Sequence, residues 1–153
     1  MNISISSLLL VFYFFFNSYA YAQSSEAKQQ GIAVDVITQS DISWDGSPLP
    51  SYPTGQPEVT ILKITIQPGV SLPIHEHPYI NAGILTKGQL TVVREDNGKT
   101  LHLKAGDSIT ELVNIWHYGK NEGKTPAEII VFYAGVKGKP VTILEKNQKH
   151  TSP

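Results

Sequence analysis

Two stretches decide the fold of this chain: GVSLPIHEHPYINAGILTKG at residues 69–88 and GDSITELVNIWHYGKN at residues 106–121. Both open on a glycine, and together they hold three of the five histidines, His75, His77 and His117. Side chains two residues apart on a β-strand point to the same face, so His75 and His77 can meet one cation. Because His117 can arrive from a strand packed nearby, the pattern predicts a metal site inside a β-barrel.

The chain outside these stretches also has the pattern of short β-strands. Apolar and polar residues alternate, turn residues recur at intervals of about ten residues, and no segment sustains a helical period. Asn97-Gly98 favours a tight hairpin turn, and the proline-rich segment 45–57 is expected to be a loop anchored by Trp44. Strands are therefore expected at residues 32–38, 59–66, 79–86, 89–95, 100–103, 108–113, 128–133 and 141–144.

Length and composition set broad limits on the function. The 153 residues suit one domain with one closed core, and the formal net charge of −1 gives no reason to expect a nucleic acid as partner. The chain has no cysteine, which excludes disulfides, thiolate metal ligands and cysteine nucleophiles. A chain without thiols fits either redox compartment.

The N-terminus indicates export. Leu8–Phe16 is an unbroken apolar run, too short to span a bilayer, and Ala20-Tyr21-Ala22 offers the small residues that signal peptidase recognises. We expect residues 1–22 to be a signal peptide cleaved before Gln23, with a periplasmic or secreted mature protein and no membrane contact after cleavage. Residues 1–7 contain no Lys or Arg, so an uncleaved anchor is the alternative.

The two stretches resemble the motifs of the cupin superfamily, in particular its small single-domain (cupin type-2) bacterial members. The resemblance implies an all-β, double-stranded β-helix (jelly-roll) barrel at residues 32–145. A disordered segment at 23–31 would precede the barrel, and a tail at 146–153 would follow it. The first motif is matched by Gly69, His75, His77 and Gly88, and the second by Gly106, His117 and Asn121.

The chain departs from the family's motifs at the position of the usual anionic ligand. Asn81 stands where the family has a glutamate, and Leu112 and Asn114 replace a proline and a glycine. Asn114 tolerates the left-handed conformation that a turn needs. Asn81 could be a fourth, neutral metal ligand or could hydrogen-bond to a ligand. Glu111, six residues before His117, could supply the missing carboxylate if strand alternation holds between them.

Three neutral imidazoles suit Fe, Mn, Ni, Cu or Zn and leave coordination positions open for a substrate. With the resemblance, this pattern implies a metal-dependent enzyme on a small molecule. A dioxygenase-like reaction is favoured over isomerisation or cyclisation, with Glu111 or Tyr118 as acid or base. The alternative is a non-catalytic cupin that binds a small ligand beside a weakened metal site. A purely structural barrel ranks last.

Other residues receive simpler interpretations. The segment Ile80–Ile84 places apolar side chains on the face opposite the histidines, so this face should be covered by the N-terminal strand or by a second subunit in a homodimer. Tyr79 shares the histidine face and is the favoured pocket tyrosine. His102 is expected at the surface, and Tyr133 in the core or barrel lining.

Overall fold

The computed structural model describes residues 31–146, and this part of the chain is all β. The predicted signal peptide, nearly all of the segment 23–31 and most of the tail lie outside the described residues. No helix in the described part could cross a membrane. The strands are β1 (Pro57–Ile66), β2 (His75–Glu76), β3 (Asn81–Lys87), β4 (Gln89–Arg94), β5 (Thr100–Lys104), β6 (Ser108–Thr110), β7 (His117–Lys120), β8 (Ala127–Val136) and β9 (Ile143–Leu144).

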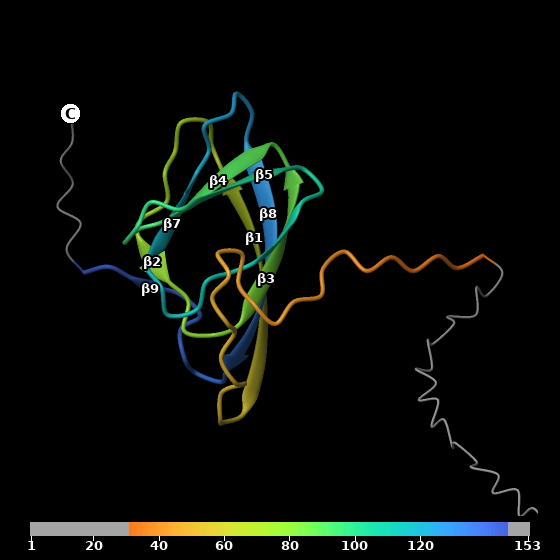
Figure 1. The fold of residues 1–153 in the computed structure, drawn as a ribbon, viewed down its shortest axis with the longest axis vertical. Coiled ribbons are helices and arrows are strands. Elements are labelled where there is room, and N and C mark those ends of the chain that lie inside the picture. The colour runs from red at the N-terminus through yellow and green to blue at the C-terminus, as the bar shows by residue number, and fades with distance from the viewer. Residues whose placement is uncertain (1–30, 147–153) are drawn as a thin grey trace, which may run out of the picture. The chain divides into compact units, whose positions relative to one another are not determined.

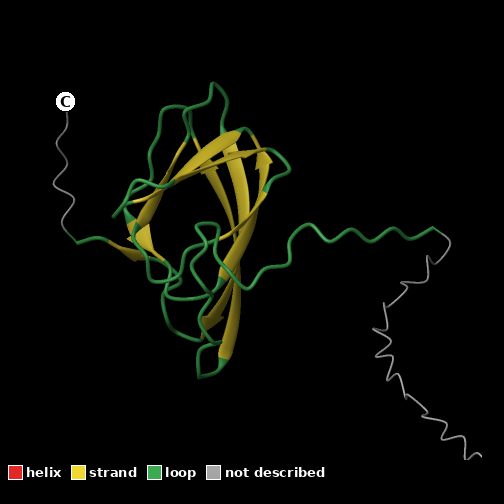
Figure 2. Cartoon of the chain, viewed as in Figure 1, coloured by secondary structure: helices red, strands yellow, loops and turns green. Residues whose placement is uncertain are grey.

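The strands form two antiparallel sheets, with the orders β1-β8-β3-β6 and β5-β4-β7-β2-β9. Neighbours in each sheet are mostly distant in sequence, as in a jelly roll, and Figures 1 and 2 show the sheets curving around a common interior. The prediction of an all-β jelly-roll fold is therefore confirmed.

Strict alternation along β8 separates the core from the outer face. Ile129, Val131 and Tyr133 are buried, whereas Ile130 and Phe132 between them are exposed. Each fully buried aliphatic side chain contributes about 1.5–3 kcal/mol to folding through removal of apolar surface from water. The buried core draws on both sheets and comprises Ile66, Leu85, Leu90, Val92, Leu103, Ile109, Ala127, Ile129, Val131 and Tyr133.

Turn residues connect the strands as their chemistry requires. Gly98, with φ +70°, turns β4 into β5, and the amide of Arg94 donates to the carbonyl oxygen of Lys99. Gly88 has φ +75°, and a Cβ there would lie 2.5 Å from the carbonyl oxygen of Pro126. Only glycine fits that corner, which explains the glycine that closes the first motif. Asn114 has the predicted left-handed conformation, with φ 55°.

The structure differs from the expected strands at several places. Residues 32–38 are exposed and form no strand, because their alternation finds no backbone ladder to join. The strand expected at 108–113 ends at Thr110, before the turn at Asn114. The short strands β2 and β7 carry His75 and His117, which were expected on strands, but their bounds were not predicted because their sequences lack a clear period of two.

The outer face of the sheet β1-β8-β3 is apolar and exposed. Val59, Ile61, Ile130 and Phe132 are between 41% and 64% exposed in the chain alone. Ile37 lines the same shallow groove as Ile61 and Phe132, so residues beside β6 reach one margin of this face. Among the described residues, 32–38 form no strand, so the N-terminal strand expected to cover this face is absent from this part of the chain.

Candidate metal centre

Three histidines from separate parts of the fold come together inside the barrel. His75 lies in β2 directly opposite His117 in β7, and His77 follows β2 by one residue. One nitrogen of each imidazole lies within 4.8 Å of the others, and the ring centroids are 4.6–5.1 Å apart. Metal–nitrogen bonds of about 2.1 Å let three such nitrogens share one ion after small ring rotations.

Backbone carbonyl groups orient all three rings. A carbonyl oxygen can only accept, so each Nδ1 carries the proton and each Nε2 keeps its lone pair. Histidine ligands of metals in proteins show this arrangement, because the second hydrogen bond sets the tautomer and the ring orientation. The Nδ1–H groups of His75, His77 and His117 donate to the carbonyl oxygens of Pro73 (2.7 Å), Val141 (3.1 Å) and Ile115 (2.7 Å).

Burial keeps the imidazoles neutral. Desolvation first, and then the like charges of His117 and His75, lower the pKa of His77 to about 3. Desolvation also lowers the pKa of His117 to about 4 and the pKa of His75 in the same direction. At neutral pH the rings are therefore in the form that binds a metal.

Glu111 brings a carboxylate to the same place. Its Oε2 lies 3.8 Å from Nε2 of His117, and both atoms are buried without a hydrogen-bond partner among the described residues. The separation is too long for a hydrogen bond. A cation between the two atoms would satisfy both, so the residues fit a divalent metal.

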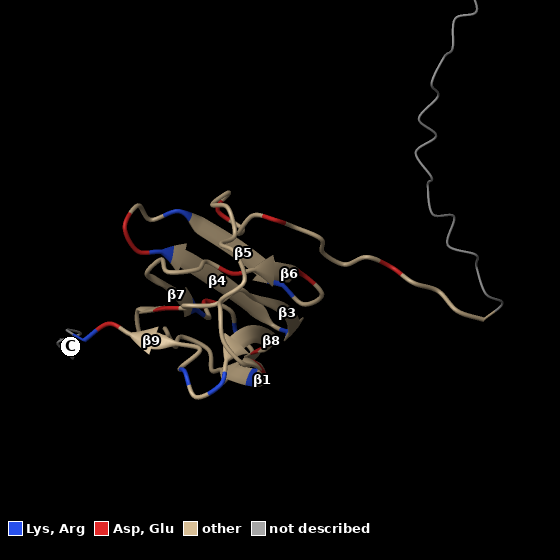
Figure 3. Ribbon diagram, turned by 90° about the horizontal axis from the view of Figure 1, so that it is seen from below, with Lys and Arg blue, Asp and Glu red and all other residues tan. Residues whose placement is uncertain are grey.

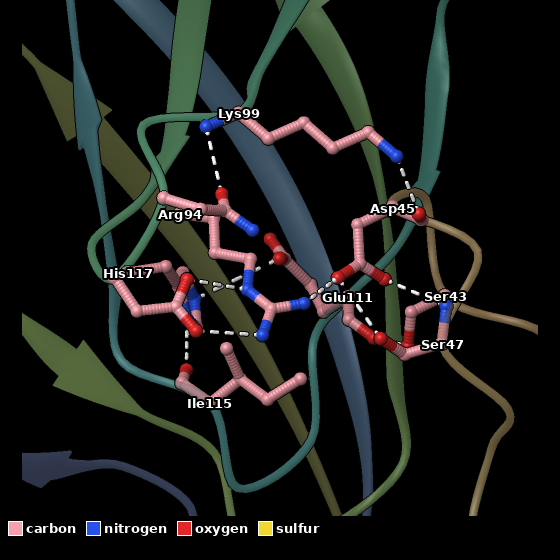
Figure 4. A network of polar contacts seen from close by, with 10 residues as sticks. Ser43, Asp45, Ser47, Arg94, Lys99, Glu111, Ile115 and His117 are labelled. Carbon is pink, nitrogen blue, oxygen red and sulfur yellow. Dashed lines mark hydrogen bonds and ion pairs between the residues drawn. The ribbon is translucent and has the colours of Figure 1, made fainter.

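The backbone of Glu111 is held on both sides although β6 has already ended. Its amide donates to the carbonyl oxygen of Asn81 (3.0 Å), and the Ser43 hydroxyl donates to its carbonyl oxygen (2.7 Å). Figure 4 shows the hydrogen bond from Ser43 to Glu111 and the approach of the Glu111 carboxylate to His117. Burial raises the pKa of the Glu111 carboxyl to about 7, so metal binding would displace a proton from it.

Asn81 is buried on β3 but does not line the cavity that contains the histidines. Its side-chain amide donates to the carbonyl oxygen of Tyr79 (3.0 Å), and its Oδ1 has no partner among the described residues. The structure therefore brings Glu111, rather than Asn81, to the cavity wall. A ligand role for Asn81 stays a prediction. Its backbone carbonyl oxygen accepts the hydrogen bond from the amide of Glu111 and so helps to hold Glu111 in place.

The tyrosine that lines the cavity is not the one that the sequence favoured. Tyr118 follows His117 on β7, lies on the opposite face and does not line the cavity, so its expected acid or base role stays a prediction. Tyr133, not the favoured Tyr79, lines the cavity, with its ring centroid 5.3 Å from that of His77. Burial, and then Glu111, raises the pKa of Tyr133 to about 12, so it is a neutral donor. Inward alternation along β8 was the signal for Tyr133.

Asn121, the last residue of the second motif, is 1% exposed and closes a turn, since its side-chain amide donates to the carbonyl oxygens of Ile66 and Thr125. The expected surface position of His102 is confirmed. His102 is exposed on β5 and takes no part in the centre.

Comparisons with known proteins agree with this geometry. The family described as "Cupin domain" matches residues 62–133, which include all three histidines and Glu111. Among curated proteins, no sequence matches the chain.

Solved structures share the fold. The polyketide cyclase RemF from Streptomyces resistomycificus aligns with a TM-score of 0.51 and 16% identity, over 60% of this chain and 63% of that chain. An uncharacterized conserved protein with a double-stranded beta-helix domain from Klebsiella pneumoniae aligns at 0.50 and 22%, over 62% and 90%. An oxalate oxidase in complex with the substrate analogue glycolate aligns at 0.49 and 25%, over 56% and 45%. This chain thus spans less than half of the oxalate oxidase.

The buried titratable groups predict how the stability of the metal-free protein depends on pH. The folded-state pKa values of His77 and His117, about 3 and about 4, lie below the usual 6.5. The unfolded chain therefore takes up more protons between pH 6.5 and 4, and the free energy of unfolding falls as pH falls. Glu111 acts oppositely: its folded-state pKa of about 7 lies above 4.5, so its contribution lowers stability as pH rises from 4.5 to 7.

Glu111→Gln removes the opposing contribution. Across pH 4.5–6.5, the free energy of unfolding of this variant should rise with pH more steeply than that of the unmodified protein, by at most about 1.4 kcal/mol per pH unit for one proton. Urea unfolding in the presence of a chelator measures both slopes. Parallel curves would mean that Glu111 is already ionised in the folded, metal-free barrel.

Proposed function

We propose that the chain is a cupin, since the cupin domain family matches residues 62–133, and that it is a metal-dependent enzyme that acts on a small molecule inside its barrel. The proposed ligands of one divalent transition metal are His75, His77, His117 and Glu111. The proposal rests above all on one observation: Nε2 of His117 and Oε2 of Glu111 are both buried, unpartnered and 3.8 Å apart. Leaving two such groups unsatisfied in an apolar interior costs several kcal/mol, and a shared cation removes that cost.

The surrounding residues support catalysis rather than mere storage of a metal. Such a metal supplies Lewis acidity or a centre for oxygen chemistry. The aliphatic wall excludes water from the bound molecule, and Tyr133 can donate a hydrogen bond to an oxygen atom held near His77. Glu111, with a pKa of about 7, can also hold or release a proton if a substrate displaces it from the metal.

Oxygen-dependent oxidation is the reaction we propose first. Three imidazoles leave open positions at the metal, and one carboxylate leaves it with a net positive charge that suits an oxygen-bearing substrate. The shared fold does not choose among reactions, because one fold hosts unrelated chemistries. A binding protein without turnover is the competing outcome, and the experiment below separates the two.

Metal content tests the ligand assignment. The protein, purified without a histidine tag, should hold about one transition metal ion per chain by mass spectrometric metal analysis. His77→Ala should abolish metal binding, and Glu111→Gln should weaken it at least tenfold, because each removes a donor from a buried site. Glu76→Gln is the matched control: it removes a carboxylate between His75 and His77 that does not line the cavity. Equal metal content in all variants would refute the assignment.

Oxygen consumption then tests turnover. The metal-loaded protein should consume O2 with at least one member of a panel of thiols, phenols and enediols, and the Glu111→Gln variant should lose most of that activity. A flat response across the panel with every loaded metal would favour the non-catalytic binder.

We further propose that the exposed outer face of β1, β8 and β3 is covered by a second copy of the chain. An apolar face of this kind is unfavourable in water, and of the residues just before the barrel only Ile37 and Thr38 are seen at its margin in the described chain. Light scattering should give twice the chain mass. Phe132→Glu should halve it, whereas Thr100→Glu, an exposed change on β5, should not. A monomeric mass for the unmodified protein would contradict the proposal.

Export stays a prediction from residues 8–22. Cleavage by signal peptidase would make Gln23 the first residue of the protein recovered from an exporting host, and N-terminal sequencing reads this directly. Recovery of chains that begin at Met1 would contradict it.

A further inference from the structure

We propose that the substrate has one metal-binding oxygen group at one end and an uncharged, apolar body about the size of one aromatic ring. This inference rests on the proposed metal centre and defines what else the cavity accepts. It follows from the composition of the cavity wall, the positions of the cations and the volume of the space.

The wall of the cavity is polar at the histidines and becomes apolar beyond them. The donors gather around the three histidines, and most of the remaining surface is aliphatic. Side chains from β1, β4, β8 and the loop before β2 form this surface, and they include Leu62, Ile64, Leu72, Leu90, Val92 and Val131. Apart from the metal-binding residues, the polar side chains of the wall are those of Tyr133 and Thr142.

No Lys or Arg lines this cavity in the described part of the chain. Arg94 faces His117 across the β4–β7 ladder, but its guanidinium pairs with Asp45 and Asp96. Figure 3 shows most of the charged residues in the connections and at strand ends. A second anionic group on the substrate would therefore be buried among aliphatic side chains with no partner, which costs several kcal/mol.

The volume limits the size of the apolar body. The cavity encloses about 200 Å³. An engineered apolar cavity of about 150 Å³ in another protein holds benzene. The space here therefore accommodates one ring with one or two small substituents, and it excludes fused ring systems unless the wall moves.

Apolar residues also line the entrance of the cavity. Pro73 and Leu144 line the cavity and are exposed, and Leu144 is paired with His75 across the β2–β9 ladder. A substrate thus passes apolar residues before it reaches the donors. Leu72 lies farther along the wall, where its amide donates to the carbonyl oxygen of Gly119, two residues beyond His117. It is well placed to contact the end of a ring whose other end binds the metal.

A matched ligand pair tests the inference. 4-Methylbenzoate and terephthalate present the same carboxylate to the metal and differ at the para position, which carries a methyl group or a second carboxylate. Terephthalate is symmetrical, so it cannot avoid burying a charge by turning round. In calorimetric titrations of the metal-loaded protein, we expect 4-methylbenzoate to bind at least tenfold more tightly than terephthalate.

Two variants locate the effect. Leu72→Lys places a cation in the wall and should reduce the preference for 4-methylbenzoate at least tenfold. Val70→Lys makes the same change in the same loop at an exposed position outside the cavity, so it should leave the preference unchanged. If Leu72→Lys does not fold, Leu62→Phe, which fills the cavity, should weaken binding of 4-methylbenzoate at least tenfold with unchanged metal content.

The outcomes separate this inference from the proposed function. Metal binding with equal affinity for both ligands, or with no affinity for 4-methylbenzoate, would overturn the substrate class and leave the metal centre standing. Failure of the unmodified protein to hold any metal would overturn both. A preference that Val70→Lys changes as much as Leu72→Lys would also overturn the inference, because the effect would then come from net charge alone.

Discussion

The pairing of β2 with β7 is the constraint on which the site depends. It sets His75 opposite His117 and brings His77 within reach of both, although β2 is only two residues long. Carbonyl groups next to these strands then accept the Nδ1 protons and turn every Nε2 inward. Strand pairing and these hydrogen bonds form without a metal, so the folded barrel already holds the donor atoms in place. The cost in stability is that polar atoms are buried without hydrogen-bond partners.

The sequence predicted the elements whose patterns are regular and the residues whose spacing is strict. Alternation identified β1, β3 and β8, and the two-residue spacing with the motif frame identified the three histidines. Sequence patterns failed where pairing decides the structure. Residues 32–38 alternate in sequence but form no strand, whereas the sequence of β7 lacks apolar–polar alternation and the strand is nevertheless held by β4 and β2. Long-range pairing energy, which no local pattern contains, decides such cases.

Glu111 is a single residue whose position also depends on long-range contacts that local sequence patterns do not contain. Counting from His117 placed Glu111 inward only if the strand continued, and the strand stops at Thr110. The inward position is instead secured by the hydroxyl of Ser43 and the carbonyl of Asn81, residues 68 and 30 positions away. The prediction that Glu111 could supply a carboxylate was geometrically sound for a reason that the sequence did not contain. The acid or base role expected of Tyr118 stays a prediction, and Tyr118 does not line the cavity because neighbours on a strand face opposite ways.

The location of Glu111 also bears on where the anionic ligand of such a centre can come from. If Glu111 binds the metal as proposed, the carboxylate comes from a segment other than the one that holds the motif's glutamate position. Here the substitution of asparagine in the first motif coexists with an acidic side chain delivered by the second. Searches that demand glutamate at a single motif position would discard chains of this kind. A criterion based on which atoms surround the trio of imidazoles would retain them.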